Sequence, residues 1–136
     1  MEPRIPRIAV GGVVLDVRGA HPTVVLVRRK HAPRAGEWSL PGGRVEHGEL
    51  LADALRREMR EECGLDVRVG DLIEVVEIVR DGMHYVIMDY ACEIVGGTLR
   101  PGDDASEASW IPVLDLREHG VTADVARVVA KALTTD

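Results

Sequence analysis

The order of the elements that the sequence predicts indicates an α/β fold. Two runs of aliphatic and β-branched residues, 7–17 and 23–29, have the composition of buried strands. Residues 43–65 carry a helical pattern, and further strand-like runs and a second amphipathic helix follow. A chain of 136 residues can bury a substantial core, and we expect a single domain over residues 1–136.

The two N-terminal strands are connected by a turn at residues 18–22, and the second strand ends in two arginines. Arg28 or Arg29 could point toward a phosphate, because guanidinium groups donate paired hydrogen bonds to phosphate oxygens. A solvent-facing strand end is the alternative. Both arginines are therefore candidate substrate-binding residues.

Residues 31–43 form a loop rich in glycine and proline that leads into the helix. Trp38 is expected to pack beneath this loop, with stacking against a nucleobase as the alternative role. Gly42 and Gly43 allow the backbone to approach the helix closely, so a main-chain carbonyl can face the same space as the helix side chains.

The helix carries acidic side chains on the face that should be buried. At about 100° per residue, Glu58 and Glu62 project within roughly 40° of each other. Leu51 and Leu55 fall in the same sector. An unpaired buried charge is unfavourable, so these carboxylates require a cation. A divalent ion bound by carboxylate oxygens meets this requirement, and Mg²⁺ is the first choice.

Two interpretations without a metal ion remain open for the same helix. Glu58, Glu61 and Glu62 could form a solvated acidic face paired with arginines one turn away. Alternatively, Arg57 could form a buried ion pair with Glu61. In either case Gly64 is positioned to end the helix.

Two strands forming a hairpin are expected after the helix. Residues 67–79 predict one strand, or two strands broken around Gly70-Asp71, and residues 84–94 predict the next. Asp81-Gly82 between them has the composition of a tight turn. Alternation along the second strand places one set of side chains on the same face, namely Tyr85, Ile87, Asp89 and Ala91.

The C-terminal part predicts a loop, a short strand and a helix. Residues 96–109 have the composition of a long polar loop, and residues 110–114 resemble a strand. Thr122 can cap the final helix, which we expect to be structural. The apolar stripe of that helix consists of Val125, Val128, Val129, Ala132 and Leu133.

The composition favours a small-molecule substrate, with no nucleic acid and no membrane as partner. The formal net charge of −6 argues against a general nucleic-acid binder, whose binding surface is basic. No apolar run is long enough to span a bilayer, and the N-terminus lacks a signal-peptide pattern. Two cysteines without a CxxC spacing make a reducing cytoplasm the expected location.

The segment from Gly43 to Leu65 resembles the Nudix box, G-x5-E-x7-R-E-U-x-E-E-x-G-U, in which U is aliphatic. The matching residues are Gly43, Glu49, Arg57, Glu58, Met59, Glu61, Glu62, Gly64 and Leu65. Two positions depart from the commonest form. Met59 replaces the more usual Leu, Ile or Val, and Leu50 replaces a Ser or Thr that would cap the helix.

The resemblance implies a Nudix α/β/α sandwich with a mixed β-sheet. It also implies hydrolysis of a nucleoside diphosphate linked to another group, with Mg²⁺ as the cofactor and Mn²⁺ as a substitute. By the same resemblance, Glu58, Glu62 and the Gly43 carbonyl are direct metal ligands. Glu61 is either a third ligand or the base for a metal-bound water.

Further roles follow from the resemblance for residues around these ligands. Arg57 would orient the carboxylates, and Glu49 would support the site through a water or by holding Arg57. The acidic loop would supply an additional ligand or base, with Asp104 as the first choice and Glu107 as the second.

The resemblance as a whole favours ADP-ribose or a nucleotide sugar as the substrate. A (d)NTP pyrophosphohydrolase that sanitises the nucleotide pool is the alternative, and a Nudix-fold module that binds such a metabolite without cleaving it is another. An isoprenoid diphosphate isomerase would need a further catalytic Cys and Glu, for which Cys92-Glu93 is a poor match. A homodimer is a common state of such proteins and is expected here.

Overall fold

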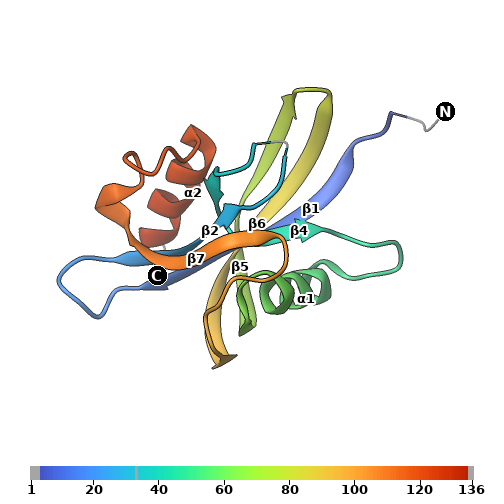
Figure 1. The fold of residues 1–136 in the computed structure, drawn as a ribbon. Coiled ribbons are helices and arrows are strands. Elements are labelled where there is room, and N and C mark those ends of the chain that lie inside the picture. Colours follow the sequence, from blue (N-terminus) through green and yellow to red (C-terminus); the bar gives the residue numbers. More distant parts are fainter. Residues whose placement is uncertain (1–3, 33, 135–136) are drawn as a thin grey trace.

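The computed structural model describes residues 4–32 and 34–134 (Figure 1). The strands are β1 (Arg7–Asp16), β2 (Thr23–Arg29), β3 (Trp38–Ser39), β4 (Gly42–Arg44), β5 (Leu65–Arg80), β6 (Met83–Gly97) and β7 (Ala105–Pro112). The helices are α1 (Leu51–Cys63), the short 3₁₀ helix η1 (Val113–Asp115) and α2 (Ala123–Leu133). Of the helices in this part of the chain, none is long and apolar enough to cross a bilayer.

β1 lies at the centre of a mixed sheet. It runs parallel to β6, with Val10 opposite Met88, and antiparallel to β4, with Val10 opposite Gly43. The end of β1 pairs with β2, which in turn pairs antiparallel with β3 and β7. β5 and β6 form the expected antiparallel hairpin. The structure therefore confirms the predicted α/β fold with a mixed sheet.

The helices α1 and α2 cover opposite faces of the sheet (Figure 1). α1 packs with Val10 and Val14 of β1 in one buried cluster, whereas α2 packs with Val13 in another. Because successive residues of a strand point to opposite faces, both faces of β1 are buried. This explains why its sequence is a nearly continuous aliphatic run.

Three regions differ from the sequence-based expectation. The predicted loop over residues 31–43 contains the short strand β3 and the start of β4. β5 is a single strand, and the break considered at Gly70-Asp71 is only a shift of register between Val69 and Leu72. β7 begins at Ala105, so the predicted loop over 96–109 was too long and only residues 98–104 are irregular. Residues 105–109 pair with β2, and this pairing outweighs their polar composition.

Candidate active site

Helix α1 directs two carboxylates inward, as its periodicity predicts. Its inner stripe includes Leu55, Met59 and Cys63, which are fully buried. Glu58 extends from the edge of this stripe, and its side chain is 17% exposed. The helix ends at Gly64, whose positive φ of 76° places it in the left-handed region and whose N–H donates to the Arg60 carbonyl at 3.1 Å.

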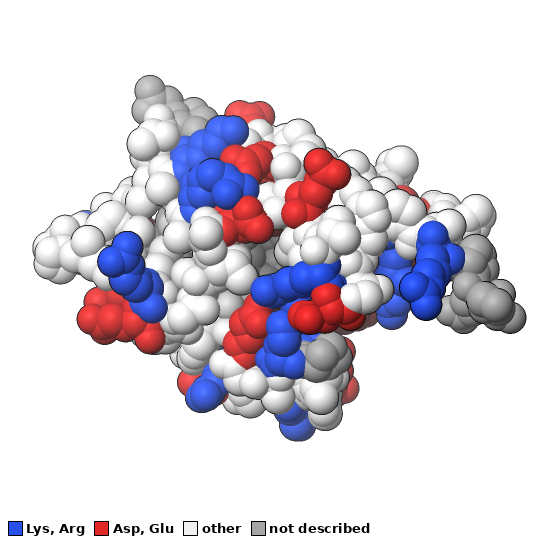
Figure 2. All heavy atoms as spheres, turned by 90° about the horizontal axis from the view of Figure 1, so that it is seen from above, with Lys and Arg blue, Asp and Glu red and all other residues white. Residues whose placement is uncertain are grey.

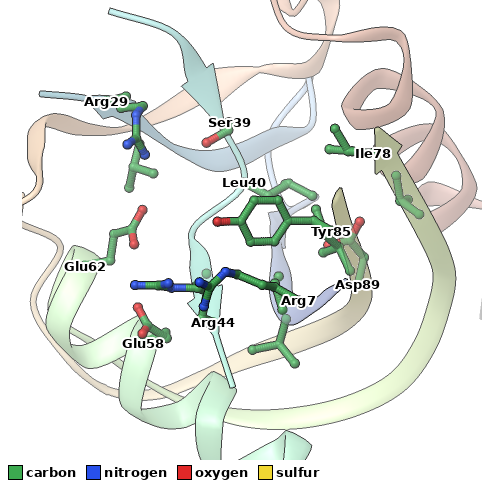
Figure 3. A pocket seen from close by; sticks show the side chains of 18 of the residues that line it. Arg7, Arg29, Ser39, Leu40, Arg44, Glu58, Glu62, Ile78, Tyr85 and Asp89 are labelled. Atoms are coloured by element: carbon green, nitrogen blue, oxygen red, sulfur yellow. The ribbon is translucent and has the colours of Figure 1, made fainter. Parts of the chain in front are cut away.

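These carboxylates line a cleft of about 930 Å³. Figure 3 shows Glu58 and Glu62 projecting from α1 into one end of it, with Arg29 opposite Glu62. Arg7 and Arg44 lie between these carboxylates and the far end of the cleft. The cleft therefore combines acidic side chains that can bind a cation with basic side chains that can bind phosphate.

The basic side chains do not form a separate surface. On the face of the molecule shown in Figure 2, most of the described Lys and Arg side chains lie next to Asp and Glu side chains. Opposite charges at close range create strong local fields while the wider field stays weak. Such a surface is suited to a small ligand with its own paired charges.

Arg57 organises the acidic groups around it. Its guanidinium donates to both carboxylate oxygens of Glu49, at 2.7 and 2.9 Å, and to Glu58 at 2.7 Å. It also reaches Glu61 at 3.3 Å and the Arg44 carbonyl at 3.1 Å. The paired hydrogen bonds from Arg57 lower the pKa of Glu49 to about 2, so Glu49 is fully ionised at neutral pH.

Of Glu49, Glu58 and Glu62, Glu62 is the carboxylate whose ionised form is least stabilised. Burial, together with the charges of Glu58 and Asp104, raises the pKa of Glu62 to about 8, and Arg29 opposes this shift. Burial also raises the pKa of Glu58, although Arg57 counteracts this shift. Two inward carboxylates that resist ionisation together are suited to a site that a cation completes.

The donor set fits a hard divalent ion. All the candidate groups offer oxygen, which Mg²⁺ prefers. Gly43 lies so close to Glu58 that a Cβ at this position would overlap its carboxylate, so only glycine lets the β4 backbone share this space. Within residues 4–32 and 34–134, no three His, Cys, Asp or Glu side chains converge as a ligand cluster. The Arg57 guanidinium instead holds Glu58 and Glu61.

The loop 98–104 brings Asp104 close to Glu62. Its amides bond to the last carbonyls of α1, from Arg100 to Cys63 at 3.0 Å and from Gly102 to Glu62 at 2.8 Å. Asp104 lines both the main cleft and a neighbouring groove that contains Glu61. The Glu61 side chain is 61% exposed, so it is on the rim of the site.

Six candidate residues do not line the main cleft: Glu49, Arg57 and Glu61, which are described above, and Arg28, Trp38 and Glu107. Arg28 pairs with Glu107 at 3.1 Å and lies over the Trp38 ring at 5.9 Å, while its neighbour Arg29 lines the cleft. Trp38 is buried and makes an edge contact with His119 at 5.5 Å between ring centroids. The structure thus places the Trp38 ring in the core, consistent with the packing role.

Many cleft residues had no site role in the sequence-based prediction, among them Arg7, Arg44, Tyr85 and Asp89. The alternation in β6 had placed Tyr85 and Asp89 on one face, but no local pattern showed which element that face would meet. Strand pairing brings Arg7 and Arg44 to the cleft, and such non-local contacts leave no mark in sequence spacing.

Comparison with known proteins agrees with the fold and with the family that the Nudix box indicates. A family model for the NUDIX domain matches residues 5–132. The ADP-ribose pyrophosphatase of Methanocaldococcus jannaschii is 36% identical over 82% of this chain and 64% of that protein. A putative 8-oxo-dGTP diphosphatase 2 of Mycobacterium tuberculosis is 33% identical over 90% of each chain. The crystal structure of a MutT NUDIX hydrolase from Burkholderia pseudomallei superposes with a TM-score of 0.77, at 28% identity, over 93% of this chain and 98% of that one.

The chain belongs to the Nudix hydrolase family, which confirms the resemblance drawn from the box. It spans slightly less than two thirds of the length of the M. jannaschii relative. The relatives carry the names of two different activities, so the substrate has to be argued from the residues of this chain.

Proposed function

We propose that this protein hydrolyses the diphosphate linkage of a nucleoside diphosphate derivative with Mg²⁺ as its cofactor and Mn²⁺ as a substitute. The observation that carries this proposal is the pair of carboxylates, Glu58 and Glu62, that α1 directs into a cleft also lined by arginines. Hydrolysis of a diphosphate requires the neutralisation of charged oxygens and the activation of a water. The cleft contains groups for both tasks.

Glu58, Glu62 and the Gly43 carbonyl would hold the ion, and Glu61 would be a third ligand or the base. When bound, Mg²⁺ supplies charge neutralisation and lowers the pKa of a coordinated water. Asp104 is the alternative base, because it lies near Glu62 and lines the same cleft. Glu107 is a weaker alternative base, because this β7 residue forms an ion pair with Arg28 of β2.

The remaining residues of the site would orient the carboxylates or bind the phosphates of the substrate. Arg57 holds Glu58 through its guanidinium, and Glu49 fixes Arg57 by a two-point hydrogen bond. Arg29 and Arg44 are directed into the cleft from β2 and β4 and can bind phosphate oxygens (Figure 3). Phosphate binding between these arginines and the α1 carboxylates would place the diphosphate linkage beside Glu62.

Two substrate groups are supported by different relatives. ADP-ribose or a nucleotide sugar is supported by the 36% identical ADP-ribose pyrophosphatase. A (d)NTP of the nucleotide-pool-sanitising type is supported by the putative 8-oxo-dGTP diphosphatase, which matches over 90% of both chains. Both groups share the diphosphate that the α1 end of the cleft is suited to bind.

The cellular setting is also a proposal. Cys63 and Cys92 are both free, and a reducing cytoplasm suits unpaired thiols. We propose a single domain acting on a small-molecule nucleotide in the cytoplasm, with a homodimer as the expected assembly.

The test is phosphate release after coupled phosphatase treatment, measured with and without Mg²⁺ on a panel of nucleotides and nucleotide sugars. We expect metal-dependent release with at least one of them. Glu58→Gln should abolish release, whereas Glu77→Gln should not, because Glu77 is exposed on β5 outside the cleft. Nucleotide binding without release would instead support the non-catalytic binding module.

A further inference from the structure

The far end of the cleft is formed by one face of β6. Tyr85, Ile87 and Asp89 alternate along this strand and line the cleft together. Tyr85 lies four residues before Asp89 on the same face of the strand, and Figure 3 shows its ring reaching from β6 into the cleft. The cleft thus has a metal-binding end on α1 and a separate end on β6, with Arg7 and Arg44 between them.

Asp89 is a buried acid without a cationic partner. The residue is 6% exposed, and within the described residues no hydrogen bond or ion pair reaches its carboxyl group. Its charged neighbours, Glu74 and Asp124, are acidic. Burial, reinforced by these two neighbours, raises the pKa of Asp89 to about 7.

Asp89 also fits closely against the backbone of β1. A Cβ at Gly11 would overlap one carboxylate oxygen of Asp89, so glycine is required at this point of the strand. The carboxyl group is therefore held between the β1 backbone and the cleft. Because Asp89 lines the cleft and no group in the described part of the chain donates to its carboxyl group, a ligand bound there can supply hydrogen bonds to it.

The chemistry of a carboxylate limits what that ligand can present. Ionised carboxylate oxygens only accept hydrogen bonds, so phosphate oxygens are unsuitable partners. Guanine presents two neighbouring donors, N1–H and the N2 amino group, which match the two oxygens of a carboxylate. Adenine presents its amino donor next to the acceptor N1, which matches the ionised carboxylate at only one point but a protonated carboxyl group at two. The selectivity for guanine therefore belongs to the ionised form and is tested at a pH above 7.

We propose that Asp89 determines the base specificity of this cleft by accepting hydrogen bonds from the donor edge of a guanine-type base. The Tyr85 ring, which lines the same cleft four residues earlier on β6, offers an apolar face against which a bound nucleotide can stack. Two hydrogen bonds from guanine would stabilise the ionised form of Asp89, which is the form that accepts both of them. Recognition by a buried polar group is selective, because a base lacking the donors leaves the carboxylate unpaired.

This inference rests on the proposed function in one respect: the phosphates bind at the Glu62 end, so the base is directed toward β6. With the base at β6, Asp89 would favour guanine over the adenine of ADP-ribose. The preference of the overall resemblance for ADP-ribose is thereby replaced by one for a guanine nucleotide.

The test is equilibrium binding, by calorimetry in the presence of Mg²⁺, of the α,β-methylene diphosphates of guanosine, inosine and adenosine. These analogues cannot be cleaved at the bridging position, so the readout is independent of hydrolysis. For the wild-type protein we expect guanosine to bind roughly 10- to 100-fold more tightly than adenosine, with inosine between them because it lacks the N2 amino group.

Asp89→Asn is the matched variant, because the amide has the same shape and offers one acceptor and one donor. The guanosine-to-adenosine affinity ratio should fall to within about threefold of unity. Removal of an acidic charge raises the affinity for all anionic nucleotides alike, so the ratio is the diagnostic quantity. Glu77→Gln, which removes an exposed carboxylate outside the cleft, should leave the ratio unchanged.

Equal affinities in the wild-type protein, or an unchanged ratio in a folded Asp89→Asn variant, would overturn the role of Asp89. So would the absence of binding by all three analogues. Thermal unfolding of each variant establishes that it is folded. Failure of the proposed hydrolysis would be recognised separately, as the absence of Mg²⁺-dependent phosphate release from any nucleotide.

Discussion

The two helices that cover the sheet differ in how their N-termini are capped and how their charged side chains are paired. In α2, the side chain of Thr122 accepts a hydrogen bond from the Val125 amide at 3.2 Å and caps the helix. Arg127 of α2 donates to Glu74 on β5 and pairs with Asp124, so these charges are paired even though Asp124 also lines the cleft. In α1, Leu50 provides no capping side chain, and Glu62 is directed into the cleft.

This difference indicates that α2 has a structural role and that α1 contributes to the candidate site. The N-terminus of α2 is capped by Thr122 and its charged side chains are paired, and its buried residues pack against the sheet. α1 packs equally well but keeps two carboxylates where ionisation is unfavourable. A protein retains such an arrangement when a ligand completes it, and the following experiments test this contrast.

The largest effect is expected for Glu62→Gln in α1. The amide keeps the shape of the side chain and removes the anionic oxygen, so the turnover number should fall roughly 10³-fold. Turnover measured over a range of Mg²⁺ concentrations checks this. Glu93→Gln is the control, because Glu93 is exposed and pairs with Arg68 away from the cleft. Wild-type turnover in the Glu62 variant would refute its role.

The same variant should be more stable than the wild-type protein at neutral pH in the presence of a chelator. The pKa of Glu62 is about 8 in the folded state against 4.5 for the free group, so the folded state binds more protons between these values. The free energy of unfolding of the wild-type protein should therefore fall as pH rises from about 4.5 to 8, by up to a few kcal/mol.

Urea unfolding at several pH values checks this dependence. The stability difference between Glu62→Gln and wild-type should widen across that pH range and then become constant. A constant difference from pH 4 to pH 8 would show that Glu62 ionises normally in the folded protein. Added Mg²⁺ should narrow the difference, because metal binding stabilises only the protein with both carboxylates.

Arg57→Lys should have an intermediate effect. Lysine cannot make the two-point contact that Arg57 makes with Glu49, so the orientation of Glu58 is lost. We expect kcat/KM to fall roughly 10- to 100-fold. Arg56→Lys is the matched control, because Arg56 is exposed and pairs only with Asp53 among the described residues. Equal kinetics for the two variants would remove Arg57 from the site.

The smallest effects concern the helix starts. Leu50→Ser should supply the missing cap of α1 and raise the free energy of unfolding by about 1 kcal/mol, and Thr122→Ala should lower it by about 1 kcal/mol. Chemical denaturation measures both changes. Neither substitution should alter turnover, and a loss of activity in Leu50→Ser would show that the start of α1 contributes to the site.

The sequence predicted α1 well because its signals are local. A period of 3.6 residues places Glu58 and Glu62 on the buried side, and Gly64 ends the helix as expected. The start of β7 was not predictable in this way, since its polar residues become a strand only by pairing with β2. Local pattern thus describes the α1 end of the cleft better than the rest of it.

The arginines at the end of β2 show the same limit. Neighbouring residues of a strand point to opposite faces, so one of Arg28 and Arg29 had to point away from the cleft. The sequence could not show which, because the answer depends on where β3 and β7 pair with β2. The structure selects Arg29 for the cleft and pairs Arg28 with Glu107.

The loop 98–104 has a consequence for engineering this protein. Its amides bind the last carbonyls of α1, so a change in loop length would break contacts that hold the end of the helix next to Glu62. Grafting specificity loops from relatives is therefore unsuitable at this position. The exposed turn at residues 18–22 has room for insertions or tags, because it lies far along the chain from these contacts and is exposed over most of its length.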